Sequence, residues 1–196
     1  MNNNYKTPAS ETSDIFCQKD TDNSINNRPI YQSYDINECP GIFAGEYPGD
    51  KDENSAKQKI DQMIKFGIKH FIDLTEENEL CPYHQLLPDN VTHFRFPIKD
   101  CKAPKSVDEV HKLLLYINEI QKDGGYVYIH CWGGVGRTGT IVSCLLSKTN
   151  NITDINEVLR LLRQNFSKMP KAAYRKTPET KSQFNFINHF IQSCKQ

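Results

Sequence analysis

The chain has 196 residues, of which 37% are hydrophobic and 24% are charged, so its composition allows one domain with a buried core. Its 24 basic residues balance 24 acidic ones, and this zero net charge argues against a nucleic-acid-binding protein. No apolar run is long enough to span a bilayer, and the first thirty residues show no secretion signal, so we expect neither a membrane span nor export.

The seven cysteines fit neither a zinc site nor a disulfide framework, because their number is odd and none form a C-x-x-C pair. Reduced thiols are typical of the cytosol. The cysteine pattern therefore predicts a cytoplasmic protein.

Residues 1–35 are polar and rich in asparagine, with little apolar surface to bury. This composition predicts an extension, disordered or loosely packed, ahead of a domain that covers residues 36–196. The alternative is an arm that docks on the domain through Ile30, Tyr31 and Tyr34.

From residue 41 onward, short β-prone runs alternate with segments whose apolar residues follow a helical period. Thr75 ahead of two glutamates indicates one further helix start, and Ser106 ahead of Glu109 is a helix cap. In chain order the pattern predicts a strand at 42–44, a helix at 56–66, strands at 70–74 and 91–98, a helix at 106–121, a strand at 126–129, and helices at 137–148, 154–166 and 179–193.

Strands separated by helices of this length predict an α/β fold, a single domain with a central, mostly parallel sheet of four or five strands flanked by helices. In such sheets ligands bind at the carboxyl ends of the strands. The glycine-rich segment 130–138 follows the strand at 126–129, so we expect it at such an end.

Segment 130–138 joins this strand to a helix start, where unpaired N–H groups and the helix dipole favour an anion. Its three glycines let the loop curl and turn its amides inward. Arg137 supplies a guanidinium that can grip two phosphate oxygens, and the same positive field favours the nucleophilic thiolate of Cys131. The segment therefore predicts a phosphate site with a nucleophile at its mouth.

The competing interpretation is a nucleoside-triphosphate site with the motif G-x-x-x-x-G-K-[ST]. Counted from Gly136, the first glycine of that motif is replaced here by Cys131 and the lysine by Arg137. These two exchanges favour phosphate-ester chemistry over nucleotide binding.

His130-Cys131, five further residues and Arg137-Thr138 resemble the signature H-C-x-x-G-x-x-R-[ST] of the protein tyrosine phosphatase superfamily. The short chain before the signature is similar to the dual-specificity branch. Segments 44–49, 73–76 and 177–183 look like its compact microbial-type subgroup, and segment 96–100 looks like the one that carries the general acid. The resemblance covers residues 38–193.

The resemblance implies a protein-tyrosine or dual-specificity phosphatase that needs no cofactor and no metal. Cys131 would attack phosphorus and form a cysteinyl-phosphate, and Asp100 would protonate the leaving group. Thr138 would hydrogen-bond the Cys131 sulfur, and His130 would order the loop from behind. The phosphate would be held by the main-chain amides of the loop and one side chain, in a set that comprises Trp132, Gly133, Gly134, Val135, Gly136 and Arg137.

The expected substrate is protein phosphotyrosine, with phosphoserine and phosphothreonine also open, because the loop carries no lysine for the extra phosphates of a phosphoinositide. Inositol phosphates and other small phosphoesters are the alternative. Two further classes are a non-catalytic phospho-binding pseudophosphatase and a sulfurtransferase of the rhodanese kind. The sequence leaves the oligomeric state open.

Several side chains carry two interpretations each. Gln183 either positions water near the loop or is an exposed helix residue. Cys81 and Cys144 either form a protective disulfide with Cys131 on oxidation or are buried, inert thiols. The alternatives to Asp100 as the acid are Asp89, Asp108 and Glu109.

Overall fold

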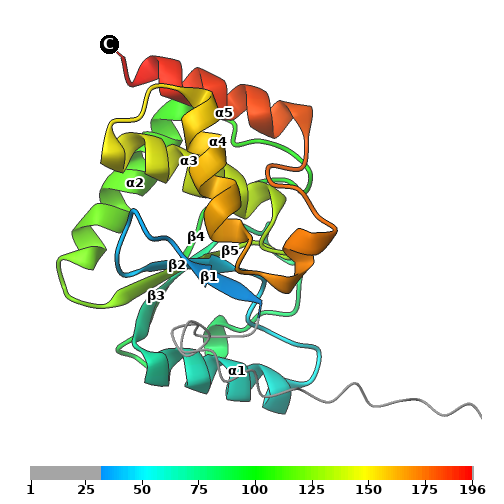
Figure 1. Ribbon diagram of the computed structural model, residues 1–196. Coiled ribbons are helices and arrows are strands. Elements are labelled where there is room, and N and C mark those ends of the chain that lie inside the picture. Colours follow the sequence, from blue (N-terminus) through cyan, green and yellow to red (C-terminus); the bar gives the residue numbers. More distant parts are fainter. Residues whose placement is uncertain (1–31, 196) are drawn as a thin grey trace, which may run out of the picture.

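A computed structural model describes residues 32–195, which form a five-stranded sheet covered by helices (Figure 1). The strand order is β1-β2-β5-β3-β4; β1 is antiparallel to β2, and the other neighbours are parallel. The prediction of an α/β domain with a mostly parallel sheet is confirmed. The strands are β1 (Ser33–Asp35), β2 (Ile42–Gly45), β3 (Ile68–Asp73), β4 (Thr92–Arg95) and β5 (Tyr126–His130).

Helix α1 (Glu53–Phe66) lies on one face of the sheet and the other α-helices lie on the opposite face (Figure 1). As the sequence predicted, Ser106 caps its helix by accepting a hydrogen bond from the N–H of Glu109. Short 3₁₀ turns interrupt two connections, at His84–Leu86 and Pro170–Ala173. The helices on the opposite face are α2 (Val107–Gln121), α3 (Gly136–Asn150), α4 (Ile155–Phe166) and α5 (Lys181–Ser193).

Two buried apolar clusters hold the layers together, one on each face of the sheet. The larger cluster joins the sheet to helices α2–α5 and includes Ile129 and Ile141, which flank the glycine-rich loop in sequence. The smaller cluster joins the sheet to α1 through residues such as Phe71 and Met63. Strand β5 contributes to both clusters, so the end of β5 is held from two sides.

The structure places residues 33–35 in the sheet, whereas their composition had assigned them to the extension. Tyr34 is fully buried, pairs with Ala44 and meets the Phe166 ring edge-on at 6.0 Å. The polar average composition of residues 1–35 gave no sign of this strand, because an edge strand needs only a few apolar side chains. Tyr34 of the predicted docking arm is therefore docked, while Ile30, Tyr31 and the rest of segment 1–31 lie outside the described residues.

The helix start expected at Thr75 is wrong. The N–H and hydroxyl of Thr75 both donate to Asp73 Oδ1, at 2.9 and 2.6 Å, and the N–H of Glu76 donates to Glu79 Oε2 at 3.0 Å. Side-chain bonds of this kind compete with helical hydrogen bonds. Residues 74–83 consequently form a loop beside the carboxyl end of β5.

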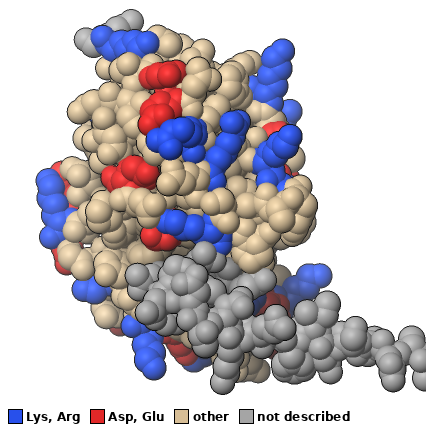
Figure 2. All heavy atoms as spheres, in the orientation of Figure 1, with Lys and Arg blue, Asp and Glu red and all other residues tan. Residues whose placement is uncertain are grey.

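Acidic and basic side chains are interspersed over the face of the molecule seen in Figure 2. Within residues 32–195, no helix has the length and apolar content that a membrane crossing requires.

Candidate active site

The glycine-rich loop lies at the carboxyl edge of the sheet, where the sequence predicted it. Strand β5 ends at His130, which pairs with Gly45 of β2 on one side and with Asp73 of β3 on the other. Helix α3 begins at Gly136, so residues 131–135 form a short connection between the strand and the helix. Cys131 is only 3% exposed, at the start of this connection.

Two glycines let neighbouring segments close around the loop. Gly134 has a φ of +68°, and a Cβ there would come under 3 Å from the backbone of Gly45 and Glu46. A Cβ on Gly136 would strike the side chains of Glu179 and Gln183. Gly134 excludes any side chain because a Cβ there would meet backbone, and Gly136 leaves room for the ends of two side chains, so the loop packs directly against the end of β2 and the start of α5.

Hydrogen bonds hold the carbonyl groups of the loop on its outer side. The N–H of Tyr47 donates to Trp132 O at 2.9 Å, and Thr177 Oγ1 donates to Val135 O at 2.7 Å. In a trans peptide the next N–H points the opposite way, toward the inside of the loop. Within residues 32–195, nothing accepts a hydrogen bond from the N–H groups of 132–135. Converging unpaired amides of this kind form an anion cradle.

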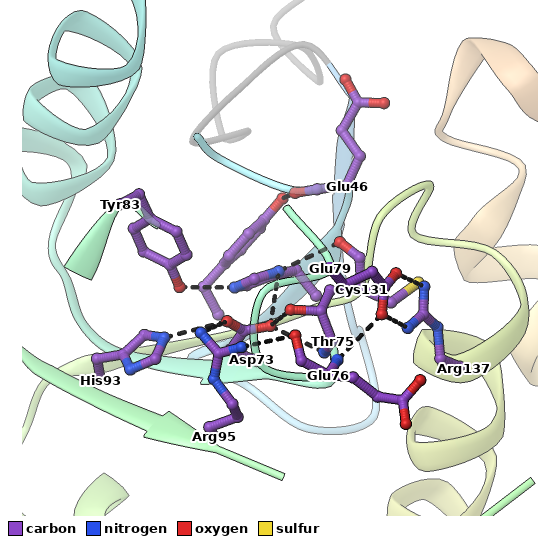
Figure 3. Close-up of polar contacts among 12 residues, drawn as sticks. Glu46, Asp73, Thr75, Glu76, Glu79, Tyr83, His93, Arg95, Cys131 and Arg137 are labelled. Carbon is purple, nitrogen blue, oxygen red and sulfur yellow. Dashed lines mark hydrogen bonds and ion pairs between the residues drawn. The ribbon is translucent and has the colours of Figure 1, made fainter. Parts of the chain in front are cut away.

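Arg137 is fixed beside this cradle by a residue that the sequence analysis missed, Glu79. The two η nitrogens of Arg137 donate to both oxygens of Glu79 at 2.7 Å (Figure 3). Nη1 also donates to Ile98 O at 3.1 Å. Burial alone would lower the pKa of Arg137, but the bonds to Glu79 and the nearby Cys131 and Asp100 raise it. The guanidinium is therefore charged and held in one orientation.

Asp100 lies at the rim of the same site. Its Oδ1 is 3.1 Å from Arg137 Nη2, and its side chain is 57% exposed. No contact with Arg137 is present for the alternative acids Asp89, Asp108 or Glu109, which all lie among the described residues. The structure instead brings another carboxylate to the loop, that of Glu179, which contacts Gly136.

His130 lies behind the cradle and is fully buried. Burial lowers the pKa of His130 to about 4, although the nearby Asp73 opposes this shift. The ring is therefore neutral, so its Nδ1–H donates to Cys131 O at 3.2 Å and its Nε2 accepts from Tyr83 Oη at 2.6 Å. Both ring nitrogens are engaged, which leaves neither nitrogen free to exchange a proton with the Cys131 thiol.

Asp73 anchors a buried polar network beside His130 (Figure 3). One of its oxygens accepts from Thr75; the other lies 3.2 Å from both His93 Nε2 and Arg95 Nη2. Burial would raise the pKa of Asp73, but hydrogen bonds from His93 and Thr75 and the nearby His130 hold it well below its usual range. The sequence offered one signal for Asp73, its place near the end of a predicted strand, and the structure shows that this strand lies next to β5.

Two predicted side chains differ from their expected environments. Thr138 Oγ1 is buried and has no hydrogen-bond partner among residues 32–195, so the expected bond to the Cys131 sulfur is not formed in this structure. Gln183 is fully buried rather than exposed, because its Oε1 caps α5 at Thr180 N and its Nε2 donates to Lys102 O at 3.3 Å. Gln183 thereby joins α5, the loop and the segment after Asp100.

The two thiols considered for a disulfide are both free, and they differ in exposure. Cys144 is fully buried in α3, and burial holds its pKa well above the usual range. Cys81 is exposed, contrary to the interpretation of both as buried thiols. Within residues 32–195 no group of three or more His, Cys, Asp or Glu side chains is placed to hold a metal ion.

The environment of His130 predicts how stability depends on pH. The pKa of His130 in the folded state, about 4, lies below its ordinary value of 6.5, so between these values the unfolded state binds more protons. The free energy of unfolding should therefore fall as the pH falls through this window, by roughly 1.4 kcal/mol per pH unit from this group. Urea unfolding between pH 4.5 and 7 should show a shallower dependence in His130→Gln than in the parent. Equal slopes would contradict this assignment.

Known proteins resemble this chain in both sequence and fold. Residues 50–186 match the family model described as "PTP-SAK: Swiss Army Knife protein, DSP-PTPase phosphatase domain". Protein 067L of Invertebrate iridescent virus 3 is 32% identical over 68% of this chain, and Tyrosine-protein phosphatase 1 of Saccharomyces cerevisiae is 31% identical over 67%. The chain spans 58% and 44% of the lengths of these two relatives.

Among solved structures, kinase associated phosphatase superposes with a TM-score of 0.68 at 18% identity, covering 86% of this chain and 97% of that one. This likeness concerns the fold. The family-model match covers most of the described domain and includes the whole loop. The chain therefore belongs to the dual-specificity and tyrosine phosphatase family.

Proposed function

We propose that this chain hydrolyses phosphate monoesters through a cysteinyl-phosphate intermediate on Cys131. The observation that carries the proposal is the arrangement around Cys131: unpaired loop amides on one side and the immobilised guanidinium of Arg137 on the other. Preorganised donors of this kind stabilise the charge of a transferring phosphoryl group. The solved structure of kinase associated phosphatase carries a substitution of that protein's catalytic site cysteine, which supports the same role for Cys131.

In the first step, the Cys131 thiolate would attack phosphorus, forming an S–P bond as the ester O–P bond breaks. Asp100 would give a proton to the departing oxygen. In the second step, Asp100 would take a proton from water as that water attacks phosphorus, which releases phosphate and regenerates the thiolate. Thr138 would stabilise the departing sulfur, and Gln183 would position the water.

The contact between Asp100 and Arg137 suggests how substrate binding could release the Asp100 side chain for its role as the general acid. Arg137 Nη2 is shared between Glu79 and Asp100 in this structure. A phosphate dianion seated in the cradle would compete with the Asp100 carboxylate for this donor and repel it. We propose that substrate binding thereby frees Asp100 from Arg137, so that its carboxyl group can turn toward the leaving oxygen.

We propose phosphotyrosine in proteins as the substrate, with phosphoserine and phosphothreonine as further candidates. Trp132 is 63% exposed, and together with Tyr47, Leu80 and Pro82 it lines a groove of about 590 Å³ next to the cradle. The groove is also lined by Asp50, Lys51, Asn78 and Glu79, and its aromatic and apolar part favours the ring of a phosphotyrosine. The yeast relative is named a tyrosine-protein phosphatase, which agrees with this assignment.

A substrate panel tests this proposal. The full chain would be given phosphotyrosine, phosphoserine and phosphothreonine peptides, an inositol phosphate and a phosphoinositide, and phosphate release would be measured as kcat/KM. We expect the highest value for phosphotyrosine peptides and inhibition by vanadate. A preference for inositol phosphate would support the small-phosphoester alternative. No turnover of any substrate would overturn the proposed activity.

We also propose that the protein acts in the cytosol on a phosphorylated protein, in the domain formed by residues 36–196. The six cysteines among the described residues are all free, which suits a reducing compartment.

A further inference from the structure

We infer that Lys171 is a positioning residue for the phosphate cradle, a role that rests on the proposed function of the loop. Lys171 lies in the 3₁₀ turn Pro170–Ala173, between α4 and α5 and far from the loop in sequence. In Figure 1 this turn belongs to the orange segment that follows α4. Its Nζ donates to Gly133 O at 2.9 Å.

The bond from Lys171 fixes one peptide plane of the cradle. The peptide between Gly133 and Gly134 is trans, so its N–H points away from the carbonyl that Lys171 holds. The Gly134 N–H is therefore turned to the inner side of the loop. A flip of this peptide would present an oxygen to the phosphate instead of a donor, and oxygen against oxyanion is repulsive.

Among the peptides of the loop, the one between Gly133 and Gly134 depends most on a hydrogen-bond donor from outside the loop. Glycine on both sides leaves it with few steric restrictions, since neither residue has a Cβ. The neighbouring carbonyls of Trp132 and Val135 already have donors from Tyr47 and Thr177. Without Lys171, Gly133 O would have no donor among the described residues.

The environment of Lys171 keeps its ammonium group in place. Its Nζ lies 2.7 Å from Glu46 Oε2, and its side chain is only 12% exposed. Glu46 directly follows β2, and its N–H is bonded to Gln32 O at 3.1 Å. Glu46 is therefore fixed at the end of β2, and its ion pair with Lys171 holds the Lys171 side chain against the loop. The position of the loop thus depends on the position of β2.

The test measures binding of inorganic phosphate without turnover. Trp132, the only tryptophan of the chain, lies in the loop, so its fluorescence reports phosphate binding directly. We expect Lys171→Met to weaken phosphate binding about 10-fold or more, below the roughly 100- to 1,000-fold loss in kcat that follows complete removal of one oxyanion donor. Lys171→Arg keeps a charged donor and should recover most of the affinity. The melting temperature should change much less than the affinity.

Lys168→Met is the matched control, because it removes the same charge from the same connection. Lys168 bonds Asp35 and Asn37, not the loop. We expect this variant to bind phosphate within about twofold of the parent, as distant surface charges contribute little. Equal losses in Lys168→Met and Lys171→Met would overturn the inference.

Glu46→Gln distinguishes a positioning role of Lys171 from a purely electrostatic effect on anion binding. This variant also tests the inference if Lys171→Met does not fold. Removal of a negative charge near the cradle would by itself tighten anion binding. If Glu46 holds Lys171 in place, the variant should instead weaken binding, with Lys171 still present. Tighter binding would overturn the inference. A parent chain that binds phosphate but shows no turnover would contradict the proposed function and leave this result standing.

Discussion

Cys131→Ser should reduce phosphate release from an aryl phosphate by about 10⁴-fold or more, the scale on which loss of a nucleophile acts in enzymes. Serine is scarcely ionised at neutral pH and would need a general base. The buried histidine next to it cannot serve, because His130 Nε2 is bonded to Tyr83 and its Nδ1 to the Cys131 carbonyl. The variant should therefore behave unlike a serine hydrolase.

Binding should survive this substitution, because the loop amides and Arg137 are unchanged. Phosphotyrosine peptide binding, followed through Trp132 fluorescence, should stay within about threefold of the parent. Cys194→Ser is the matched control, since Cys194 is a free thiol at the end of α5, outside the groove, and it should retain turnover. If Cys131→Ser and the parent release phosphate at equal rates, hydrolysis does not pass through Cys131.

Asp100→Asn should slow turnover about 100-fold or more for esters with poor leaving groups, in the range typical of general acid catalysis. For esters with good leaving groups the loss should be only a few-fold, because these groups depart without a proton. The amide keeps the size of the side chain and removes the acid. A series of substituted phenyl phosphates, compared by kcat/KM, measures this difference directly.

Glu179→Gln is the informative comparison, because Glu179 is a carboxylate close to the loop, at Gly136, that does not hold Arg137 as Glu79 does. If Asp100 is the acid, Glu179→Gln should show the same loss for every leaving group. A loss in Glu179→Gln that grows as the leaving group becomes poorer would move the acid role from Asp100 to Glu179. Both results are read from the same series of substrates.

Two failures of prediction have different physical causes. Thr75 carries the local signal of a helix start, yet its hydroxyl bonds Asp73, and the segment becomes a loop. Gln183 sits on a helix that local pattern places at the surface, yet it is fully buried between α5 and the loop. At Thr75 a local side-chain bond outcompetes helical hydrogen bonds, whereas Gln183 bonds Lys102 O, 81 residues away, a partner that local propensity cannot register.

The phosphate loop could be predicted because its chemistry is contiguous in sequence. A strand, a nucleophile, glycines and an arginine in register already define a cradle at a helix start. The positions of its supports could not be predicted. Glu79 holds Arg137 from a loop 58 residues away, and Lys171 reaches Gly133 across 38 residues.

The sequence by itself determined the α/β class, the loop at the carboxyl edge of β5, and the residues Cys131 and Arg137 within it. Local physics suffices for these features, because helical and strand periods and glycine conformation act over a few residues. Only the tertiary structure decided which donors bind the outer carbonyls of the loop and which carboxylate orients Arg137. It alone also showed that Tyr34 belongs to the edge strand of the sheet. These contacts join residues far apart in the chain, and packing alone brings them together.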